Sequence, residues 1–279
     1  MSETDFLAGM AAASHARVQA ARAQMSGVDL RARAVDSALP PRMQLSSRRF
    51  DLIAEVKFRS PAADVLREGS EDSVRARVAG YADAGAAVVS VLTEPTRFDG
   101  SLQHLESAVR ALAGRIPAMR KDFLVDPYQV CEARLAGAGG VLVIMRMLSD
   151  TEVAALVECA AQLRLFVLLE AFDEADIARA SQVVKQYARS AELLVGVNSR
   201  DLATLQVVPG RLEELVRLLP DEVPRVAESG VATAADAGRV AVAGYDVALV
   251  GSALMNALEP LQLARAMISS GRNERARRS

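Results

Sequence analysis

The sequence predicts an α/β protein, a single (β/α)8 TIM barrel with an extra N-terminal helical segment. Eight short apolar runs recur along the chain, several with Val, Ile or Leu at consecutive positions. Such runs are typical of strands that are buried on both faces of a parallel sheet. Amphipathic helical patterns lie between the runs. The length of 279 residues accommodates eight strand–helix units, whereas a doubly wound sheet usually has fewer strands.

An N-terminal segment, residues 1–48, precedes the first apolar run and forms the predicted helical extension. Residues 3–22 are expected to form an amphipathic helix with Phe6, Leu7 and Met10 among its apolar residues. The segment has acidic residues near its start and lacks the basic start and apolar core of a signal peptide. We therefore interpret it as part of the fold.

The eight strands are expected at 52–57, 87–93, 116–123, 140–145, 165–171, 193–198, 224–229 and 246–252. Helices are expected at 70–85, 126–139, 149–163, 173–190 and 233–244. Gly85 is a candidate C-cap, Asp126 a candidate N-cap followed by Pro127, and Ser149 opens a capping motif. The charged tail, 271–279, is expected to fray. No linker divides the chain, so one domain is predicted over residues 1–279.

The composition excludes several classes of function. The net charge of −2 provides no overall field for nucleic acid or an anionic membrane. Aromatic residues make up 4% with 0 Trp, which argues against base-stacking platforms, and no uncharged apolar run approaches the roughly 18 residues of a membrane span. Cys131 and Cys159 are too few for a disulfide framework and fit no zinc site. We expect a cytoplasmic protein that binds neither nucleic acid nor membrane and contains no metal.

Polar residues end most of the predicted strands. They are Glu55 and Lys57, Thr93 and Glu94, Lys121 and Asp122, Glu170, Asn198 with Ser199 and Arg200, Glu228 and Ser229, and finally Gly251 and Ser252. In a TIM barrel these strand ends meet around the active site. Any one of them is consistent with a solvated rim, but the two lysines together with the three glutamates Glu55, Glu170 and Glu228 favour proton transfer. Burial lowers the pKa of Lys and raises that of Glu, which brings both toward neutrality.

The last two strand ends indicate a phosphate site. Gly230 and Gly251 each precede a predicted helix, and glycine allows the backbone to approach an anion closely. The loops after strands seven and eight often bind phosphate in this fold. Arg200 adds a candidate bidentate contact.

Seven blocks of the sequence resemble indole-3-glycerol phosphate synthases, the (β/α)8 enzymes of tryptophan biosynthesis. The blocks occur in family order: IAEVKFRSP (53–61), VSVLTEPTRFDGSLQHL (89–105), MRKDFLVDPYQVCEARLAGA (119–138), LLEAF (168–172), VGVNSRDLATLQV (195–207), VAESGV (226–231) and LVGSALM (249–255). The resemblance implies conversion of 1-(2-carboxyphenylamino)-1-deoxyribulose 5-phosphate to indole-3-glycerol phosphate, with loss of CO2 and water and without a cofactor. It also implies a small phosphorylated substrate as the partner, and we expect a monomer or weak homo-oligomer.

The resemblance implies a role for each matching residue. Lys121 is expected to be the general acid toward the substrate ketone, and Glu170 the general base of the closing dehydration. Lys57, positioned by Glu55, is expected to hold the substrate carboxylate. The other implied residues are Asn198, Glu228 and Ser229 in the polar pocket, Arg200, Gly230, Gly251, Ser252 and Ser60 at the phosphate, and Phe98 and Phe123 beside the anthranilate ring. The N-terminal helix is compatible with closing over the site.

The sequence departs from the family pattern in three places. The first loop, KFRSPAAD (57–64), has Phe58 where the family has a basic residue, and Ala62, Ala63 and Asp64 replace a later Ser, Lys and Gly. Phe172 replaces a common His, and residues 181–192 form a slightly longer stretch than usual. The first loop covers the substrate in the family, so loop closure or substrate choice is the property most affected.

Three alternatives remain open at this point. The altered first loop is consistent with a paralogue that acts on a modified anthranilate substrate in specialised metabolism. The related phosphoribosylanthranilate isomerase has a Cys at the first strand end, where this chain has Lys57, and both cysteines fall on predicted helices. A catalytically silent partner barrel would have no physical need to keep charged residues in a pocket.

Overall fold

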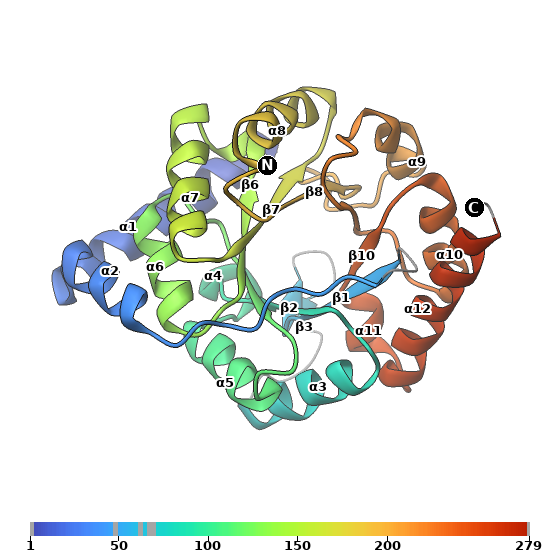
Figure 1. Cartoon of the computed structure of the whole chain (residues 1–279), viewed down its shortest axis with the longest axis horizontal. Helices are drawn as coiled ribbons and strands as arrows, with labels where there is room; N and C mark the ends of the chain where they lie inside the picture. Colours follow the sequence, from blue (N-terminus) through green and yellow to red (C-terminus); the bar gives the residue numbers. More distant parts are fainter. Residues whose placement is uncertain (1–2, 47–49, 61–63, 66–70, 278–279) are drawn as a thin grey trace.

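The computed structural model describes residues 3–46, 50–60, 64–65 and 71–277. Within these residues, eight parallel strands close into a barrel in the order β1-β10-β9-β8-β7-β6-β5-β4, and β1 pairs with both β10 and β4 (Figure 1). The strands are β1 (Asp51–Val56), β4 (Val88–Leu92), β5 (Ala118–Lys121), β6 (Gly140–Ile144), β7 (Phe166–Ala171), β8 (Leu193–Asn198), β9 (Arg225–Glu228) and β10 (Val247–Val250). The predicted TIM barrel is confirmed.

Helices surround the barrel (Figure 1). The larger ones are α3 (Glu71–Asp83), α5 (Leu102–Leu112), α6 (Pro127–Leu135), α7 (Asp150–Gln162), α8 (Glu174–Tyr187), α10 (Ala234–Ala243) and α12 (Pro260–Ala276). The shorter elements are α4 (Pro95–Phe98), α9 (Arg211–Leu215), α11 (Ser252–Asn256), η1 (Met145–Met147), η2 (Val216–Leu218) and the paired strands β2 (Arg59–Ser60) and β3 (Asp64–Val65). The Asp126 side chain caps α6, and Ser149 forms a capping box on α7, as predicted.

The N-terminal extension consists of two helices, α1 (Glu3–Gln24) and α2 (Gly27–Asp36). The helix predicted over residues 3–22 is confirmed. Phe6, Leu7 and Met10 of α1 are buried and pack with residues of the barrel interior. Leu30 and Ala34 of α2 are buried, and α2 packs on α6. The extension therefore contacts the barrel through apolar side chains, which anchor it by the hydrophobic effect.

The barrel residues are buried on both faces, which explains the continuous apolar runs. One set faces the interior and includes Ile53, Met119 and Phe166, whereas another set lies between the strands and the helices. Gly140 leaves room for Phe166, because a Cβ on Gly140 would lie 2.3 Å from the Phe166 ring. The interior is therefore a packed core below the site.

The C-terminal tail corrects one prediction. Residues 271–276 do not fray, because α12 continues to Ala276 and its last turns are tied to the barrel. Arg272 donates to the Phe50 carbonyl at 3.0 Å and to Asp51 at 2.6 Å. Arg275 donates to Asp246 at 2.9 Å. The arginines that predicted a solvated tail are partners of acidic residues at the start of β1 and β10.

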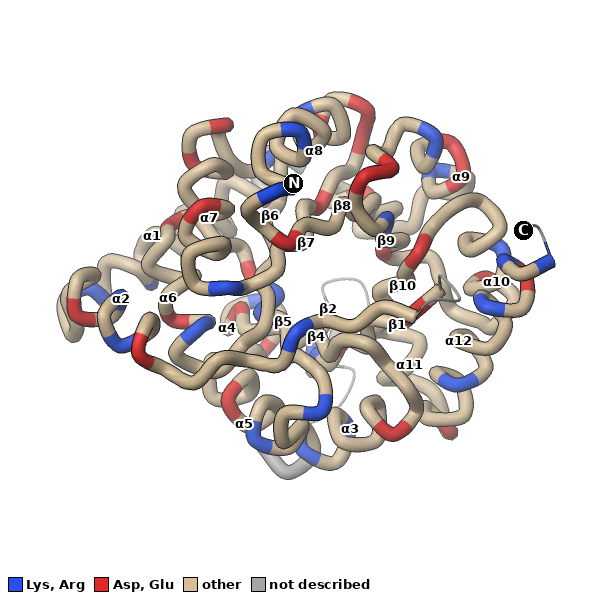
Figure 2. The backbone as a smooth tube through the Cα atoms, in the orientation of Figure 1, with Lys and Arg blue, Asp and Glu red and all other residues tan. Residues whose placement is uncertain are grey.

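Lys, Arg, Asp and Glu are interspersed over the helices in Figure 2, without a region of a single sign in this view. This distribution agrees with the small net charge of −2. Over the described part of the chain, no helix combines the length and the hydropathy that crossing a membrane requires.

Candidate active site

A cavity of about 400 Å³ lies where the carboxyl ends of the barrel strands meet. The predicted site residues that line it are Glu55, Lys57, Phe98, Lys121, Phe123, Glu170, Asn198, Arg200, Glu228, Ser229, Gly230, Gly251 and Ser252. Ser60 is in β2, and its side chain lies outside the described residues, as do Ala62 and Ala63. The structure thus brings together all the other residues to which the sequence assigned a catalytic or binding role. Thr93, Glu94 and Ser199, which also end predicted strands, do not line the cavity.

Lys121 is the last residue of β5 and stands between two glutamates. Its Nζ lies 3.3 Å from Glu170 Oε1 and 3.9 Å from Glu228 Oε2. Asn198 Nδ2 donates to the same Glu170 oxygen at 2.8 Å, and Asn198 Oδ1 accepts from the Arg200 backbone N–H at 2.9 Å. Strands β5, β7, β8 and β9 therefore hold one connected polar group at the cavity floor.

The pKa of Lys121 shifts in the direction opposite to that expected from burial alone. Burial by itself lowers the pKa, but the carboxylates of Glu170, Glu228 and Glu55 outweigh it and raise the pKa of Lys121 above its ordinary value. Lys121 is therefore an ammonium at neutral pH. An ammonium in a cavity can donate a proton or a hydrogen bond to developing negative charge.

The pKa of Glu228 shifts in the direction that burial predicts. Burial and the neighbouring Glu170 raise the pKa of Glu228 well above its ordinary value. A Cβ on Gly196 would lie 2.3 Å from Glu228 Oε1, so the glycine leaves the space that this carboxyl group occupies. The direction of this shift favours the protonated form of Glu228, whereas the nearby Lys121 ammonium favours the carboxylate.

The raised pKa of Glu228 predicts a pH dependence of stability. Because the folded state holds this proton more tightly than the unfolded state, its stabilising contribution is complete below the ordinary glutamate pKa of about 4.5. The contribution is lost as the pH rises through the raised value. We expect Glu228→Gln, which stays neutral, to lose less stability than the parent chain as the pH rises above about 4.5, measured by urea unfolding. Parallel curves for the two proteins would contradict the shift.

Lys57 and Glu55 form a second pair at the end of β1. Lys57 Nζ lies 2.8 Å from Glu55 Oε1. Burial opposes ionisation of Glu55, but Lys57 and Lys121 together lower its pKa below the ordinary value. Gly251 makes this arrangement possible, since a Cβ there would lie 2.1 Å from Glu55 Oε1 and 3.1 Å from Lys57 Nζ.

We expect Gly251→Ala to displace this pair. The added methyl group forces a shift that costs about 1–3 kcal/mol of stability, as in other overpacked sites, and turnover falls because Lys57 moves. Urea unfolding and steady-state kinetics measure both effects. Gly9→Ala is the matched control, because nothing lies within 4 Å of a Cβ at that helical position. A neutral result at Gly251 would show that the cavity tolerates the displacement.

One end of the cavity offers backbone groups and an arginine. Ser229 and Gly230 have positive φ values of 63° and 74°, so the chain turns sharply after β9. Gly251 and Ser252 begin α11 after β10. Arg200 lines the same cavity, and its guanidinium donates to the Leu205 carbonyl at 2.5 Å. Free N–H groups and a guanidinium together suit an anion such as phosphate.

The opposite side of the cavity is apolar. The Phe123 ring lies 6.0 Å from the rings of Phe98 and Phe6. Sequence reasoning did not assign Phe6 to the cavity lining, nor Leu142, Ile144 and Phe172, which also line it. The signal for Leu142 and Ile144 was available, because alternate residues of a barrel strand face the interior.

The chain is similar in sequence to known proteins of one family. The family model described as indole-3-glycerol phosphate synthase matches residues 7–267. The chain belongs to this family. The indole-3-glycerol phosphate synthase of Micrococcus luteus is 44% identical over 215 residues, 77% of this chain and 76% of that protein. The synthase of Mycobacterium sp. strain KMS is 37% identical and covers 97% of this chain and 96% of its own length. The predicted family is confirmed, and with it a decarboxylating lyase.

Solved structures support the architecture. The 3-hexulose-6-phosphate synthase of Salmonella typhimurium aligns with a TM-score of 0.62 at 15% identity, covering 82% of this chain and 100% of that chain. At this identity the likeness concerns the fold alone. It agrees with the closed barrel described above.

In this member of the synthase family, the residues on either side of Lys121 bond to groups other than those around the Lys121 ammonium. Side chains alternate along a strand, so Arg120 of β5 points toward the helices while Lys121 points inward, and Asp122, which follows the strand, contributes to the cavity lining. Arg120, which is 3% exposed, donates to Asp122 and to Glu132 of α6, both at 3.0 Å. Thr93 donates to Asp122 at 2.8 Å. The three consecutive charged residues therefore serve two separate environments.

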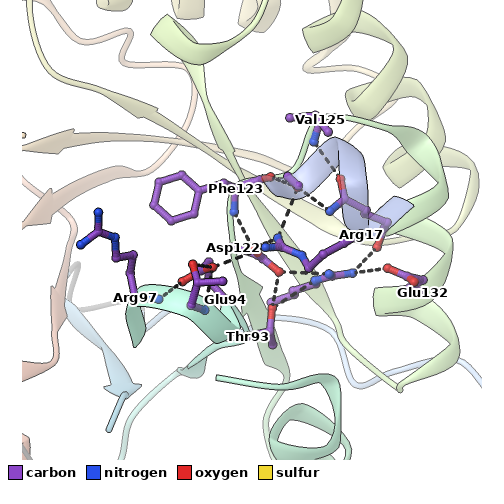
Figure 3. A network of polar contacts seen from close by, with 12 residues as sticks. Arg17, Thr93, Glu94, Arg97, Asp122, Phe123, Val125 and Glu132 are labelled. Atoms are coloured by element: carbon purple, nitrogen blue, oxygen red, sulfur yellow. Dashed lines mark hydrogen bonds and ion pairs between the residues drawn. The ribbon is translucent and has the colours of Figure 1, made fainter. Parts of the chain in front are cut away.

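Helix α1 completes this buried network, which Figure 3 shows beside Phe123. Arg17 lies 2.7 Å from Asp122 Oδ1 and 3.5 Å from Glu94 Oε1. Ser14 donates to the Phe123 carbonyl at 2.5 Å. Arg120 and Arg17 outweigh burial and lower the pKa of Asp122. The N-terminal helix is thus fixed to the chain segment that carries Lys121, a link that sequence reasoning did not predict.

Proposed function

We propose that the enzyme converts 1-(2-carboxyphenylamino)-1-deoxyribulose 5-phosphate to indole-3-glycerol phosphate, without a cofactor. The observation that carries the proposal is the position of the Lys121 ammonium. It stands between Glu170 and Glu228 in a cavity with an aromatic side and an anion-binding end. A substrate with an aromatic ring, a ketone and a phosphate requires these three environments together.

Lys121 is the proposed general acid. The anthranilate ring carbon attacks the ketone carbon, a carbon–carbon bond forms, and the ketone oxygen takes a proton from the Lys121 Nζ. The raised pKa of Lys121 keeps this proton in place at neutral pH. Asn198 and Glu170, which contact one another at 2.8 Å, fix the direction of the ammonium.

The later steps need a base and a carboxylate partner. Loss of CO2 restores the aromatic ring, and Glu170 is the proposed base in the loss of water that completes the indole. Lys57, which Glu55 positions at 2.8 Å, holds the substrate carboxylate. Arg200, Ser229, Gly230, Gly251 and Ser252 hold the phosphate, and Phe98 and Phe123 contact the ring; Ser60 is proposed to join the phosphate site from the first loop.

The described residues of the altered first loop give no support for a second reaction. Phe58, which replaces a basic residue, is 4% exposed and packs against His104 with ring centroids 5.0 Å apart. It does not line the cavity. Phe172 does line it and stacks on Arg146, whose guanidinium carbon lies 4.6 Å from the ring centroid. The alternative, a modified anthranilate substrate, rests on the altered first loop, of which Ala62 and Ala63 lie outside the described residues.

Described residues of one chain line the cavity from every strand end named above, which supports a monomer or a weak homo-oligomer. The free cysteines Cys131 and Cys159 support the reducing cytoplasm as its location.

The proposal is tested by mixing the purified protein with the substrate and following indole fluorescence. The chain has 0 Trp, so the product is seen over little protein background. We expect a rise in fluorescence with the unsubstituted substrate. No rise from folded protein would overturn the proposal, and turnover of ring-substituted analogues alone would favour the alternative.

A further inference from the structure

Two cysteines form a contact outside the proposed active site. Cys131 of α6 and Cys159 of α7 are the 2 cysteines of the chain, and both are free. Their Sγ atoms lie 3.9 Å apart, and each residue is 4% exposed. Neither cysteine lines the cavity. The pair is therefore unrelated to the chemistry proposed above.

An arginine from the N-terminal extension contacts one cysteine of the pair. Arg31 of α2 is exposed, and its guanidinium donates to Cys159 Sγ at 3.7 Å and to Gln162 Oε1. Cys159 Sγ also lies 3.7 Å from the Pro127 carbonyl oxygen. A positive charge next to two touching sulfur atoms stabilises a thiolate, which is the reactive form of cysteine.

The two sulfur atoms share one hydrogen bond. The Cys159 thiol as donor lowers the pKa of Cys131 to about 7, against the effect of burial and with help from Arg31. The same hydrogen bond and burial raise the pKa of Cys159. The contact between the sulfur atoms and the nearby Arg31 thus place a thiolate beside a thiol that can resolve it. The lowered pKa of Cys131 makes Cys131 the attacking sulfur in the proposal.

We propose that Cys131 and Cys159 are an oxidation site at which hydrogen peroxide forms an intrachain disulfide. The Cys131 thiolate attacks the peroxide oxygen, the O–O bond breaks, and a sulfenic acid forms with release of water after protonation. Cys159 then loses its proton and attacks the Cys131 sulfur, which forms the S–S bond and releases a second water. Two electrons pass from the two thiols to the peroxide.

The disulfide requires only a local movement. The sulfur atoms must close from 3.9 Å to the S–S bond length of ~2.05 Å. The bond links α6 to α7, the helices on either side of β6 in the sequence. A thiol-based reductant reverses it.

The test uses the full-length protein and hydrogen peroxide. Folded protein is treated with a small molar excess of peroxide, denatured, alkylated with N-ethylmaleimide and weighed by mass spectrometry. We expect monomeric protein that is lighter by two hydrogen atoms, takes up no maleimide, and takes up two after reduction. Retention of both thiols, or addition of oxygen without a cross-link, would overturn the proposal.

Single variants assign the two sulfurs. We expect Cys159→Ser to give a sulfenic acid that dimedone traps, and Cys131→Ser to react at least about tenfold more slowly under the same conditions. Faster reaction of Cys131→Ser would overturn the assignment of the attacking sulfur. Arg31→Gln is expected to slow disulfide formation several-fold, with circular dichroism confirming that each variant is folded. An unchanged rate would show that the arginine has no part in the site.

Discussion

Replacing Lys121 by methionine is expected to lower kcat by about 10²- to 10⁴-fold, the usual contribution of a positioned general acid. Methionine keeps most of the volume of the side chain and removes only the ammonium. The proposed substrate contacts of Lys57, Arg200 and the backbone groups after β9 and β10 remain in the cavity. We therefore expect the loss to fall on kcat more than on substrate affinity, which steady-state kinetics and calorimetry separate.

Lys185→Met is the matched control for this variant. Lys185 lies on α8, is exposed, and has no place in the cavity lining. Its replacement should leave kcat within about twofold, because surface substitutions away from the site seldom change function or stability. If Lys121→Met retained a tenth or more of the parent kcat, the proposed proton donor would have to be a different group.

The second large effect is expected at Arg120. Arg120→Met leaves Asp122 buried with fewer cationic partners, because Arg120 supplies a hydrogen bond at 3.0 Å and a charge that lowers the Asp122 pKa. Breaking a buried ion pair by removing one partner costs about 3–5 kcal/mol. We expect a loss of that size in the free energy of unfolding, measured by urea denaturation.

A surface pair provides the comparison. Arg22 of α1 contacts Asp126 at the start of α6 at 2.9 Å, and its side chain is 51% exposed. Arg22→Met is therefore expected to cost less than about 1 kcal/mol. Equal costs for Arg22→Met and Arg120→Met would mean that burial adds nothing to the network around Asp122.

The expected strands and helices agree with the structure because each depends on a local pattern. Continuous apolar runs such as LLVGVN (193–198) became buried barrel strands, and Asp126 and Ser149 cap helices as predicted. The end of the chain differed. From the sequence, Arg272 and Arg275 were expected to belong to a solvated tail. In the structure, Arg272 hydrogen-bonds to Asp51 and Arg275 to Asp246.

The members of the candidate site were also available from the sequence. Strand ends in a closed parallel barrel must converge, so polar residues at 55, 57, 121, 170, 198 and 228 were expected to meet. The protonation states of these residues could not be predicted from the sequence. Burial alone predicts a lowered pKa for Lys121, whereas the two glutamates placed beside it by β7 and β9 raise the pKa.

The sequence by itself determined the barrel, the family and the polar residues at the strand ends around the cavity, because these follow from hydrophobic periodicity and from motifs at strand ends. Only the tertiary structure decided which charges are neighbours. Arg17 is 105 residues from Asp122 in the chain and 2.7 Å away in space. Cys131 and Cys159 are 28 residues apart and in contact. Electrostatic and sulfur chemistry depend on distances of a few ångström, and those distances are set by packing between elements far apart in the sequence.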